Sequence, residues 1–226
     1  VPIGVTILLS ILIGTITFSG SFVAVGKLSG QMSGNPISFP GMRLLTVLLA
    51  LAVLGCFGLV VANAGVAYES NTEDHSDDDW RRVMSINLDG VFYTARAFGN
   101  IMLEQGIGSI VAISSIAGVK AVRPELHVGY DVTKAGVAHF CKVVGIEWAA
   151  RGVRVHARGP AYTNTEMLQK VGIEQPEVVA RWIHDIPMGR LLEPAEIAQA
   201  VSFLASDAAS GITGQLLMAD AGYSTA

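Results

Sequence analysis

The sequence predicts an α/β protein with a parallel sheet, preceded by two apolar helices of the kind that cross membranes. From residue 59 onward, short apolar runs alternate with longer segments of helical periodicity, which is the pattern of strands joined by crossover helices. Before residue 66 the only charged side chains are Lys27 and Arg43, and all 19 acidic residues come later. Aliphatic stretches with so little charge are typical of membrane spans. We therefore divide the chain into an apolar segment, residues 1–58, and an α/β domain, residues 59–226.

The apolar segment contains two candidate transmembrane helices, at about residues 3–26 and 44–61. A hydrocarbon core of about 30 Å needs about 20 apolar residues in a helix, and both runs are near this length. The loop between them, residues 27–43, contains glycines and prolines that end helices. The alternative is a signal peptide followed by core strands, although no basic stretch precedes the first apolar run.

Each element of the α/β domain has its own signal. Leu59–Ala62 is a short apolar run that indicates a buried strand. Ser76, followed by three aspartates, is the expected N-cap of a helix that runs to about Gln105. The remaining elements, in chain order, are a strand at Ser109–Ile113, a helix from about Tyr130 to Ala150, a strand at Val153–Ala157, a helical region at about Glu166–Ile186, a helix opened by Pro194 and a strand near Gln215–Met218.

Composition excludes several classes of function. Charged residues make up only 15% of the chain, the net charge is −4, and no cluster of Lys and Arg exists to neutralise phosphates, so a nucleic-acid binder is excluded. Cys56 and Cys141 each lie in an apolar run and are expected to be core residues rather than a disulfide. The five histidines lack the spacing of metal ligands, so we predict no metal site.

Polar and small residues follow the predicted strands in a distinctive order. They are Asn63-Ala64-Gly65, Asn87, Ser114-Ser115, Tyr130 with Lys134, Gly159-Pro160 and Thr165, followed near the end by Ile212-Thr-Gly214 and Asp220-Ala-Gly222. This ordered set resembles the short-chain dehydrogenase/reductase family over about residues 59–226. The loop Val122-Arg-Pro124 ahead of Tyr130 is most similar to the polyol dehydrogenases within that family.

The chemistry of Tyr130 and Lys134 can be argued from their spacing. Residues four apart on a helix share one face, so the phenol and the ammonium are expected to be neighbours. A nearby positive charge favours the phenolate, and we therefore expect the pKa of Tyr130 to lie below its usual value near 10. Ser115 follows a strand at the carboxyl edge of the sheet, where open α/β folds bind ligands, so its hydroxyl could hold a substrate oxygen.

The resemblance assigns further roles. It implies that Tyr130, Ser115, Lys134 and Asn87 are catalytic, with Lys134 also binding the nicotinamide ribose and Asn87 anchoring a water in the proton path. It implies NAD or NADP as cofactor and a small secondary alcohol or ketone as substrate, and it leaves a homo-oligomer open. The residues expected to contact the cofactor are Asn63, Ala64, Gly65, Tyr130, Lys134, Pro160, Ala161 and Thr165.

The resemblance also shows what is missing. The family normally begins with a strand, a TGxxxGxG turn and a helix that bind the cofactor pyrophosphate, and residues 1–58 contain no such turn. The fold class is therefore expected to be the C-terminal part of a Rossmann-like doubly wound sheet without its first βαβ units, and binding of NAD or NADP is expected to be weak. Smaller departures from the family pattern are Ala112, His156, Ala161 and Ala221.

The apolar segment has a resemblance of its own. The run from Thr17 through Gly30 to Pro40-Gly41 is similar to the membrane domain of the NAD(P) transhydrogenase beta subunit, over about residues 3–55. Three functions follow as hypotheses: an impaired NAD(P)-dependent oxidoreductase, a catalytically inactive chimeric membrane fragment, or part of a transhydrogenase-like proton-translocating assembly. We expect residues 1–61 to associate with a membrane and the dehydrogenase part to be cytoplasmic, with a wholly cytoplasmic protein as the alternative.

Overall fold

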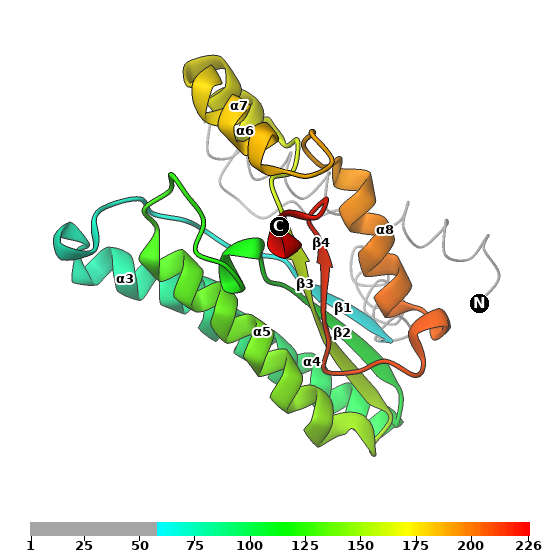
Figure 1. Cartoon of the computed structure of the whole chain (residues 1–226). Coiled ribbons are helices and arrows are strands. Elements are labelled where there is room, and N and C mark those ends of the chain that lie inside the picture. Colours follow the sequence, from blue (N-terminus) through cyan, green and yellow to red (C-terminus); the bar gives the residue numbers. More distant parts are fainter. Residues whose placement is uncertain (1–57) are drawn as a thin grey trace, which may run out of the picture. The chain divides into compact units, whose positions relative to one another are not determined.

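The computed structural model describes residues 58–226, which form a parallel four-stranded sheet with helices on both faces (Figure 1). The strands are β1 (Leu59–Ala62), β2 (Gly108–Ile113), β3 (Val153–Pro160) and β4 (Leu216–Ala219), and they lie in the order β1-β2-β3-β4. All three neighbouring pairs are parallel. This arrangement confirms the predicted Rossmann-like parallel α/β sheet.

The predicted membrane helices fall almost entirely outside the described residues. The run at 3–26 and residues 44–57 of the second run cannot be compared with the structure. The end of the second run, residues 58–61, is wrong as a helix, because β1 begins at Leu59 and pairs with β2 from Leu59 to Ala62. Within residues 58–226, no helix is both long enough and apolar enough to span a bilayer.

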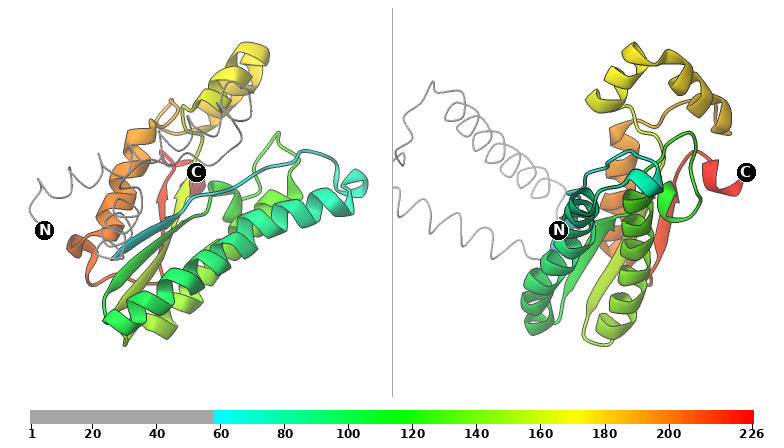
Figure 2. Two further views of the ribbon diagram at one scale, coloured as in Figure 1. Left: turned by 180° about the vertical axis from the view of Figure 1, so that it is seen from behind. Right: turned by 90° about the vertical axis from the view of Figure 1, so that its left-hand side faces the viewer.

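Two helices cover one face of the sheet and a third covers the other. Helices α4 (Gly90–Gln105) and α5 (Val128–Ala149) lie side by side on one face, and α8 (Pro194–Ala205) lies on the opposite face (Figures 1 and 2). The strand side chains that face α4 and α5 form the main core, which includes Ile110 and Val155. Because strand side chains alternate between faces, Ser109 and Arg154 point the other way and bond to the carbonyl of Leu204 in α8.

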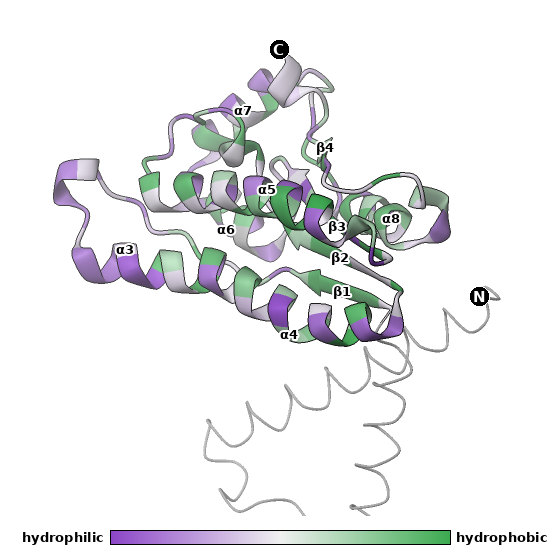
Figure 3. Cartoon of the chain, turned by 90° about the horizontal axis from the view of Figure 1, so that it is seen from below, coloured by the Kyte–Doolittle hydropathy of each residue, from purple (hydrophilic) through white to green (hydrophobic). Residues whose placement is uncertain are grey.

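The long helix predicted from Ser76 to Gln105 is interrupted. Helix α3 (Asp77–Met84) begins as expected, since the Ser76 hydroxyl accepts a hydrogen bond from the backbone N–H of Asp79 at 3.1 Å. Residues Ser85–Asp89 then form one π-helical turn before α4 starts. Such wide turns occur mostly at functional sites, and this one contains Asn87. Figure 3 shows α3 as mainly hydrophilic, in contrast to the strands.

Other boundaries differ from prediction by a few residues. β3 continues three residues further, to Pro160, and α5 begins two residues earlier, at Val128. The helical region at 166–186 is two helices, α6 (Glu166–Glu174) and α7 (Pro176–Asp185), because Pro176 has no N–H to continue the first and occupies the first position of the second. Short 3-10 turns lie at Thr72–Asp74, Ile116–Gly118, Asp207–Ala209 and Tyr223–Thr225.

Helices α4 and α5 pack through a close contact between Gly99 and the Trp148 ring. A Cβ added at Gly99 would lie 2.3 Å from the Trp148 ring, so glycine is the only residue that fits without movement. Cys141, on the same side of α5, is fully buried, which confirms its predicted role in the core, and burial raises the pKa of its thiol to about 12.

We expect Gly99→Ala to lower the free energy of unfolding by about 1–3 kcal/mol, because the new methyl group would push Trp148 out of place. Gly90→Ala in the same helix is the matched control, since a Cβ there would meet the Ser85 carbonyl at an ordinary contact distance of 3.6 Å. Urea unfolding of the two variants measures both values. Equal stability of the two would contradict the packing described here.

The half-buried Arg154 and the buried His156 form a polar pair between β3 and α8. The guanidinium of Arg154 donates to the carbonyls of Leu204 at 2.7 Å and Ser206 at 3.0 Å, where α8 ends. Arg154 Nη1 also lies 3.1 Å from His156 Nε2, which must accept because arginine only donates. Burial, assisted by the Arg154 charge, lowers the pKa of the fully buried His156 from 6.5 to about 4.

We expect this histidine to make the protein acid-sensitive. Its folded pKa lies below its unfolded value, so the stability is complete above pH 6.5 and falls as the pH drops toward 4, by up to about 3 kcal/mol. In His156→Asn this part of the pH dependence should disappear, whereas the exposed His139→Asn should retain it. Chemical unfolding at several pH values checks the difference, and parallel curves for all three proteins would show that His156 is not responsible.

Candidate functional site

The predicted site residues meet at the carboxyl edge of the sheet. Because the strands are parallel, the segments that follow β1, β2 and β3 emerge at the same edge, where open α/β folds bind ligands (Figure 1). Asn63–Gly65 follow β1, and Ser114 and Ser115 follow β2. Pro160 ends β3. Helix α5 passes this edge with its first turns, which contain Tyr130 and Lys134.

Lys134 lies against the face of the Tyr130 ring. Its Nζ is 5.4 Å from the ring centroid and donates a hydrogen bond of 2.7 Å to the carbonyl oxygen of Ile113 at the end of β2. The lysine is 4% exposed, and burial lowers its pKa to about 8, so the ammonium is still the main form at neutral pH. The predicted proximity of the two side chains is confirmed.

The prediction that Lys134 lowers the pKa of Tyr130 below its usual value is wrong. The pKa of Tyr130 is raised, chiefly because the phenol is buried, and the negative charge of Asp131 adds to the rise. The Ser115 side chain acts in the opposite direction but does not outweigh burial. Lys134 does not reverse the effect, because its ammonium lies over the ring and is bonded to Ile113 rather than to the phenol oxygen.

The two serines after β2 have different contacts. The Ser114 hydroxyl donates to the backbone oxygen of Lys134 at 2.7 Å and so ties the loop to α5. The Ser115 hydroxyl accepts from the backbone N–H of Ala117 at 3.1 Å and is close enough to Tyr130 to influence its pKa. The Ser115 hydroxyl makes a side-chain hydrogen bond with Tyr130 that acts to lower the pKa of the phenol, so its proton is directed toward the Tyr130 oxygen.

Asn87 uses its side chain to hold the loop after β1. Its Oδ1 accepts from the N–H of Val66 at 2.8 Å, and its Nδ2 donates to the Val66 carbonyl at 2.9 Å and to Thr133 Oγ1 at 3.1 Å. The residue is fully buried. Its amide is thus occupied by the protein, and a water anchored at Asn87 would have to use backbone atoms of the π-helical turn.

Only some of the residues predicted to contact the cofactor lie close to Lys134. Gly65 lies directly beside the lysine, since a Cβ at this position would be 3.3 Å from Lys134 Nζ, and Asn63 and Ala64 are exposed beside it. Thr165 is exposed at the start of α6, while Ala161 is 9% exposed and packs against Ile186 and Leu192 in a second core cluster. No glycine-rich turn for the pyrophosphate of a dinucleotide occurs in residues 58–226.

One departure from the family pattern has a backbone consequence. Ala221 has a φ of 53°, in the left-handed region where a Cβ is unfavourable and glycine is normal. It lies in the tight turn before Gly222, whose φ is 90°. The side chain is 7% exposed and belongs to the second core cluster.

The structure adds residues near Tyr130 that the sequence analysis did not select. His127 is buried, its ring centroid is 5.0 Å from that of Tyr130, and its Nδ1 is 2.7 Å from Asp131 Oδ1. Glu125 accepts hydrogen bonds from the Tyr162 hydroxyl and from Trp182 Nε1, which connects α7 to the loop before α5. The spacing of His127 and Asp131, four residues apart, is the sequence signal that could have predicted their contact.

No cluster suited to a metal ion occurs among residues 58–226. His127 and Asp131 form a pair without a third ligand, and His156 lies apart between β3 and α8.

Two family profiles match the chain. The profile described as Enoyl-(Acyl carrier protein) reductase matches residues 47–224, which is well over half of the chain. The profile of the NAD(P) transhydrogenase beta subunit matches residues 3–75 and overlaps the first over residues 47–75. The second match agrees with the resemblance noted for the apolar segment, but a membrane domain there is not confirmed.

The similar proteins include two sugar-alcohol dehydrogenases. Galactitol 2-dehydrogenase (L-tagatose-forming) of Cereibacter sphaeroides is 43% identical over 165 residues, covering 73% of this chain and 65% of that protein. D-threitol dehydrogenase of Mycolicibacterium smegmatis is 40% identical over 172 residues, covering 76% and 65%. This chain therefore spans about two thirds of the length of such relatives.

Solved structures share the fold of this chain. The crystal structure of gox2181 is 43% identical with a TM-score of 0.72, covering 74% of this chain and 65% of that one. A gluconate 5-dehydrogenase from Burkholderia cenocepacia, solved with NADP and tartrate, is 30% identical with a TM-score of 0.70, covering 74% and 65%. With residues 47–224 matched by the reductase profile and the Tyr130–Lys134 pair at the carboxyl edge of a parallel sheet, this chain belongs to the short-chain dehydrogenase/reductase family.

Proposed function

We propose that the chain is an NAD(P)-dependent oxidoreductase that interconverts a secondary alcohol and a ketone, with a polyol as the substrate class. The observation that carries this proposal is the buried ammonium of Lys134 over the ring of Tyr130, next to Ser115 and Gly65. The polyol class is supported by the relatives, which include galactitol and D-threitol dehydrogenases. The missing pyrophosphate turn makes the activity weak in this chain.

In the oxidation direction, the phenol of Tyr130 must first lose its own proton to solvent, and the resulting phenolate then accepts the hydroxyl proton of the substrate alcohol. Ser115 donates a hydrogen bond to the same substrate oxygen and fixes its distance from the phenol. Burial raises the pKa of Tyr130, so the phenol keeps its proton at neutral pH and is in the protonated form that the ketone oxygen needs in the reverse direction, although as a weaker acid than a free phenol. When bound, NAD or NADP would supply the acceptor for the hydride from the carbinol carbon, and its reduced form would supply that hydride in the opposite direction.

Lys134 has two tasks in this scheme. Its ammonium stabilises the negative charge that appears on Tyr130 as the proton moves, and its remaining N–H groups are available for the ribose hydroxyls of the cofactor. Asn63, Ala64 and Gly65 would border the ribose on the β1 side, and Pro160, Ala161 and Thr165 would border the nicotinamide. Asn87 holds Val66 and therefore positions the β1 side of this site.

The test is an assay for alcohol-dependent reduction of the cofactor by the whole chain. The chain is mixed with galactitol, D-threitol or sorbitol and with NAD or NADP at several millimolar, and the absorbance of the reduced nicotinamide is followed. We expect slow reduction with at least one polyol. No reduction with any polyol or simple secondary alcohol, in a sample shown to be folded, would favour a catalytically inactive chain.

A homo-oligomer and membrane association through residues 1–61 remain predictions. Light scattering of the purified chain tests for the homo-oligomer. Cell fractionation tests whether residues 1–61 bring a cytoplasmic dehydrogenase part to a membrane. No observation on residues 58–226 favours a role in a transhydrogenase-like membrane assembly, and we do not propose it.

A further inference from the structure

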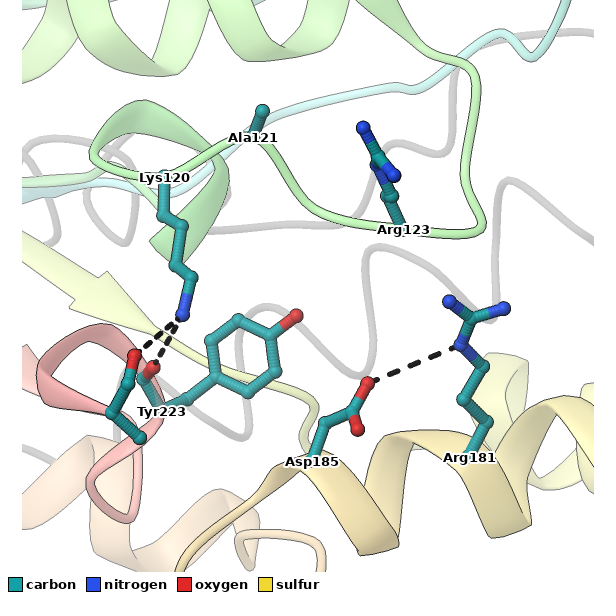
Figure 4. Close-up of a pocket in the computed structure, with 7 residues that line it drawn as sticks. Lys120, Ala121, Arg123, Arg181, Asp185 and Tyr223 are labelled. Atoms are coloured by element: carbon teal, nitrogen blue, oxygen red, sulfur yellow. Dashed lines mark hydrogen bonds and ion pairs between the residues drawn. The ribbon is translucent and has the colours of Figure 1, made fainter.

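A pocket lies between the loop before α5, helix α7 and the last turn of the chain. Its volume is about 510 Å³, and its lining residues are Lys120, Ala121, Arg123, Arg181, Asp185, Tyr223 and Ala226. Figure 4 shows Lys120 beside Tyr223, Arg181 and Asp185 on α7, and Arg123 on the loop. None of these residues was selected for the proposed catalytic chemistry.

Three cationic side chains from two separate segments border this pocket. Lys120 is already bonded, since its Nζ donates to the backbone oxygen of Ala226 at 2.8 Å and lies 5.2 Å from the centroid of the Tyr223 ring. Arg123 is exposed and makes no hydrogen bond or ion pair with the described residues. Arg181 has one acidic neighbour, Asp185, at 4.0 Å, and their side chains are 54% and 38% exposed.

Two acidic residues lie near these cations. Glu125 belongs to the same loop and acts to raise the pKa of Tyr223, but its carboxylate already accepts hydrogen bonds from Tyr162 and Trp182. Asp185 is shared with His184, whose Nδ1 lies 3.0 Å from Oδ1. The pocket is therefore bordered by two guanidinium groups with unused donors and by one partly occupied carboxylate.

A guanidinium group presents paired N–H donors that match the oxygens of a carboxylate or a phosphate. Positively charged side chains that border the same pocket repel each other, and an anion bound between them reduces this repulsion. We propose that this pocket binds a small oxyanion, the phosphate or carboxylate group of an anionic metabolite, between Arg123 and Arg181.

The position of the pocket gives such binding a structural consequence. Arg123 lies on the loop that runs from Ser115 to Tyr130, and Arg181 lies on α7, which already contacts this loop through Trp182 and Glu125. An anion held by both arginines adds a second connection between the loop and α7. It would fix the segments on two sides of the proposed substrate site without touching Tyr130.

The test is a titration of the whole chain with sodium phosphate and with sodium malonate, at constant ionic strength, followed by amide NMR. We expect saturable shifts at Ala121, Arg123, Arg181 and Tyr223. Arg123→Gln and Arg181→Gln should each weaken binding at least fivefold, and the double variant should bind neither anion. Arg96→Gln is the matched control, because Arg96 stacks on Phe92 and Tyr93 of α4 and does not line the pocket.

Comparing the two anions distinguishes a phosphorylated ligand from a carboxylic acid. Tighter binding of phosphate indicates a phosphorylated metabolite, and tighter binding of malonate indicates a carboxylic acid. Shifts that sodium chloride reproduces, or that persist in the double variant, would overturn the site. The titration needs no cofactor and no turnover, so its result is independent of the proposed oxidoreductase function.

Discussion

Tyr130→Phe is expected to lower the rate of alcohol-dependent cofactor reduction at least about a hundredfold. The phenol oxygen is the only group in the proposed scheme that exchanges a proton with the substrate, and losing a positioned acid or base typically costs a factor of about 10² to 10⁴. The aromatic ring stays in place, so Lys134 and His127 keep their neighbours. Initial rates at saturating polyol measure the effect.

Tyr93→Phe is the matched control, since Tyr93 is exposed on α4 and contacts Phe92 and Arg96. It should retain full activity. Lys134→Ala should also lose most activity, whereas Lys142→Ala, an exposed position on the same helix, should not. Turnover by Tyr130→Phe at the wild-type rate would remove Tyr130 as the acid and base.

The second large effect concerns the cofactor, because the chain is expected to bind NAD(H) and NADP(H) only in the millimolar range. The pyrophosphate has two negative charges that the family holds on backbone N–H groups of a glycine-rich turn, and this sequence has no such turn. Each charge-assisted hydrogen bond is worth about 1.5–3 kcal/mol, and the step from micromolar to millimolar corresponds to about 4 kcal/mol. Isothermal titration calorimetry measures the dissociation constant.

The comparison protein for this titration is the gluconate 5-dehydrogenase of Burkholderia cenocepacia, whose structure contains NADP. It should bind NADP far more tightly than this chain under the same conditions. A dissociation constant in the low micromolar range for this chain would contradict the prediction. It would show that other residues supply the donors for the pyrophosphate.

The sheet and the central pair could be predicted because their signals are local. Strands β1, β2 and β4 are short, mainly apolar runs, and β3 alternates apolar with polar residues. Tyr130 and Lys134 are placed on one helix face by their spacing alone. The ends of elements were harder to predict. The π-helical turn at Ser85–Asp89 contains Asn87, whose contacts with Val66 and Thr133 join residues that are distant in sequence. Pro176 was a local signal for splitting α6 from α7 that was not used.

The electrostatics of the site could not be predicted from spacing. Whether Lys134 lowers the pKa of Tyr130 depends on burial and on where the ammonium points, and both follow from the packing of α5 against β2. Arg158 is a second example, since a charged residue in β3 gave no sign that it would be fully buried. Its Nη1 donates to the Leu217 carbonyl at 2.7 Å, and burial lowers its pKa to about 10.

The central claim is that this chain moves hydride between an alcohol and a nicotinamide at Tyr130, and isotope transfer tests it most directly. The chain is incubated with millimolar NAD or NADP and a polyol carrying deuterium on its carbinol carbons, and the reduced cofactor is analysed by mass spectrometry. The account predicts deuterium in the reduced nicotinamide with the wild-type chain and none with Tyr130→Phe. Absence of deuterium with the folded wild-type chain, or equal transfer by both proteins, would contradict it.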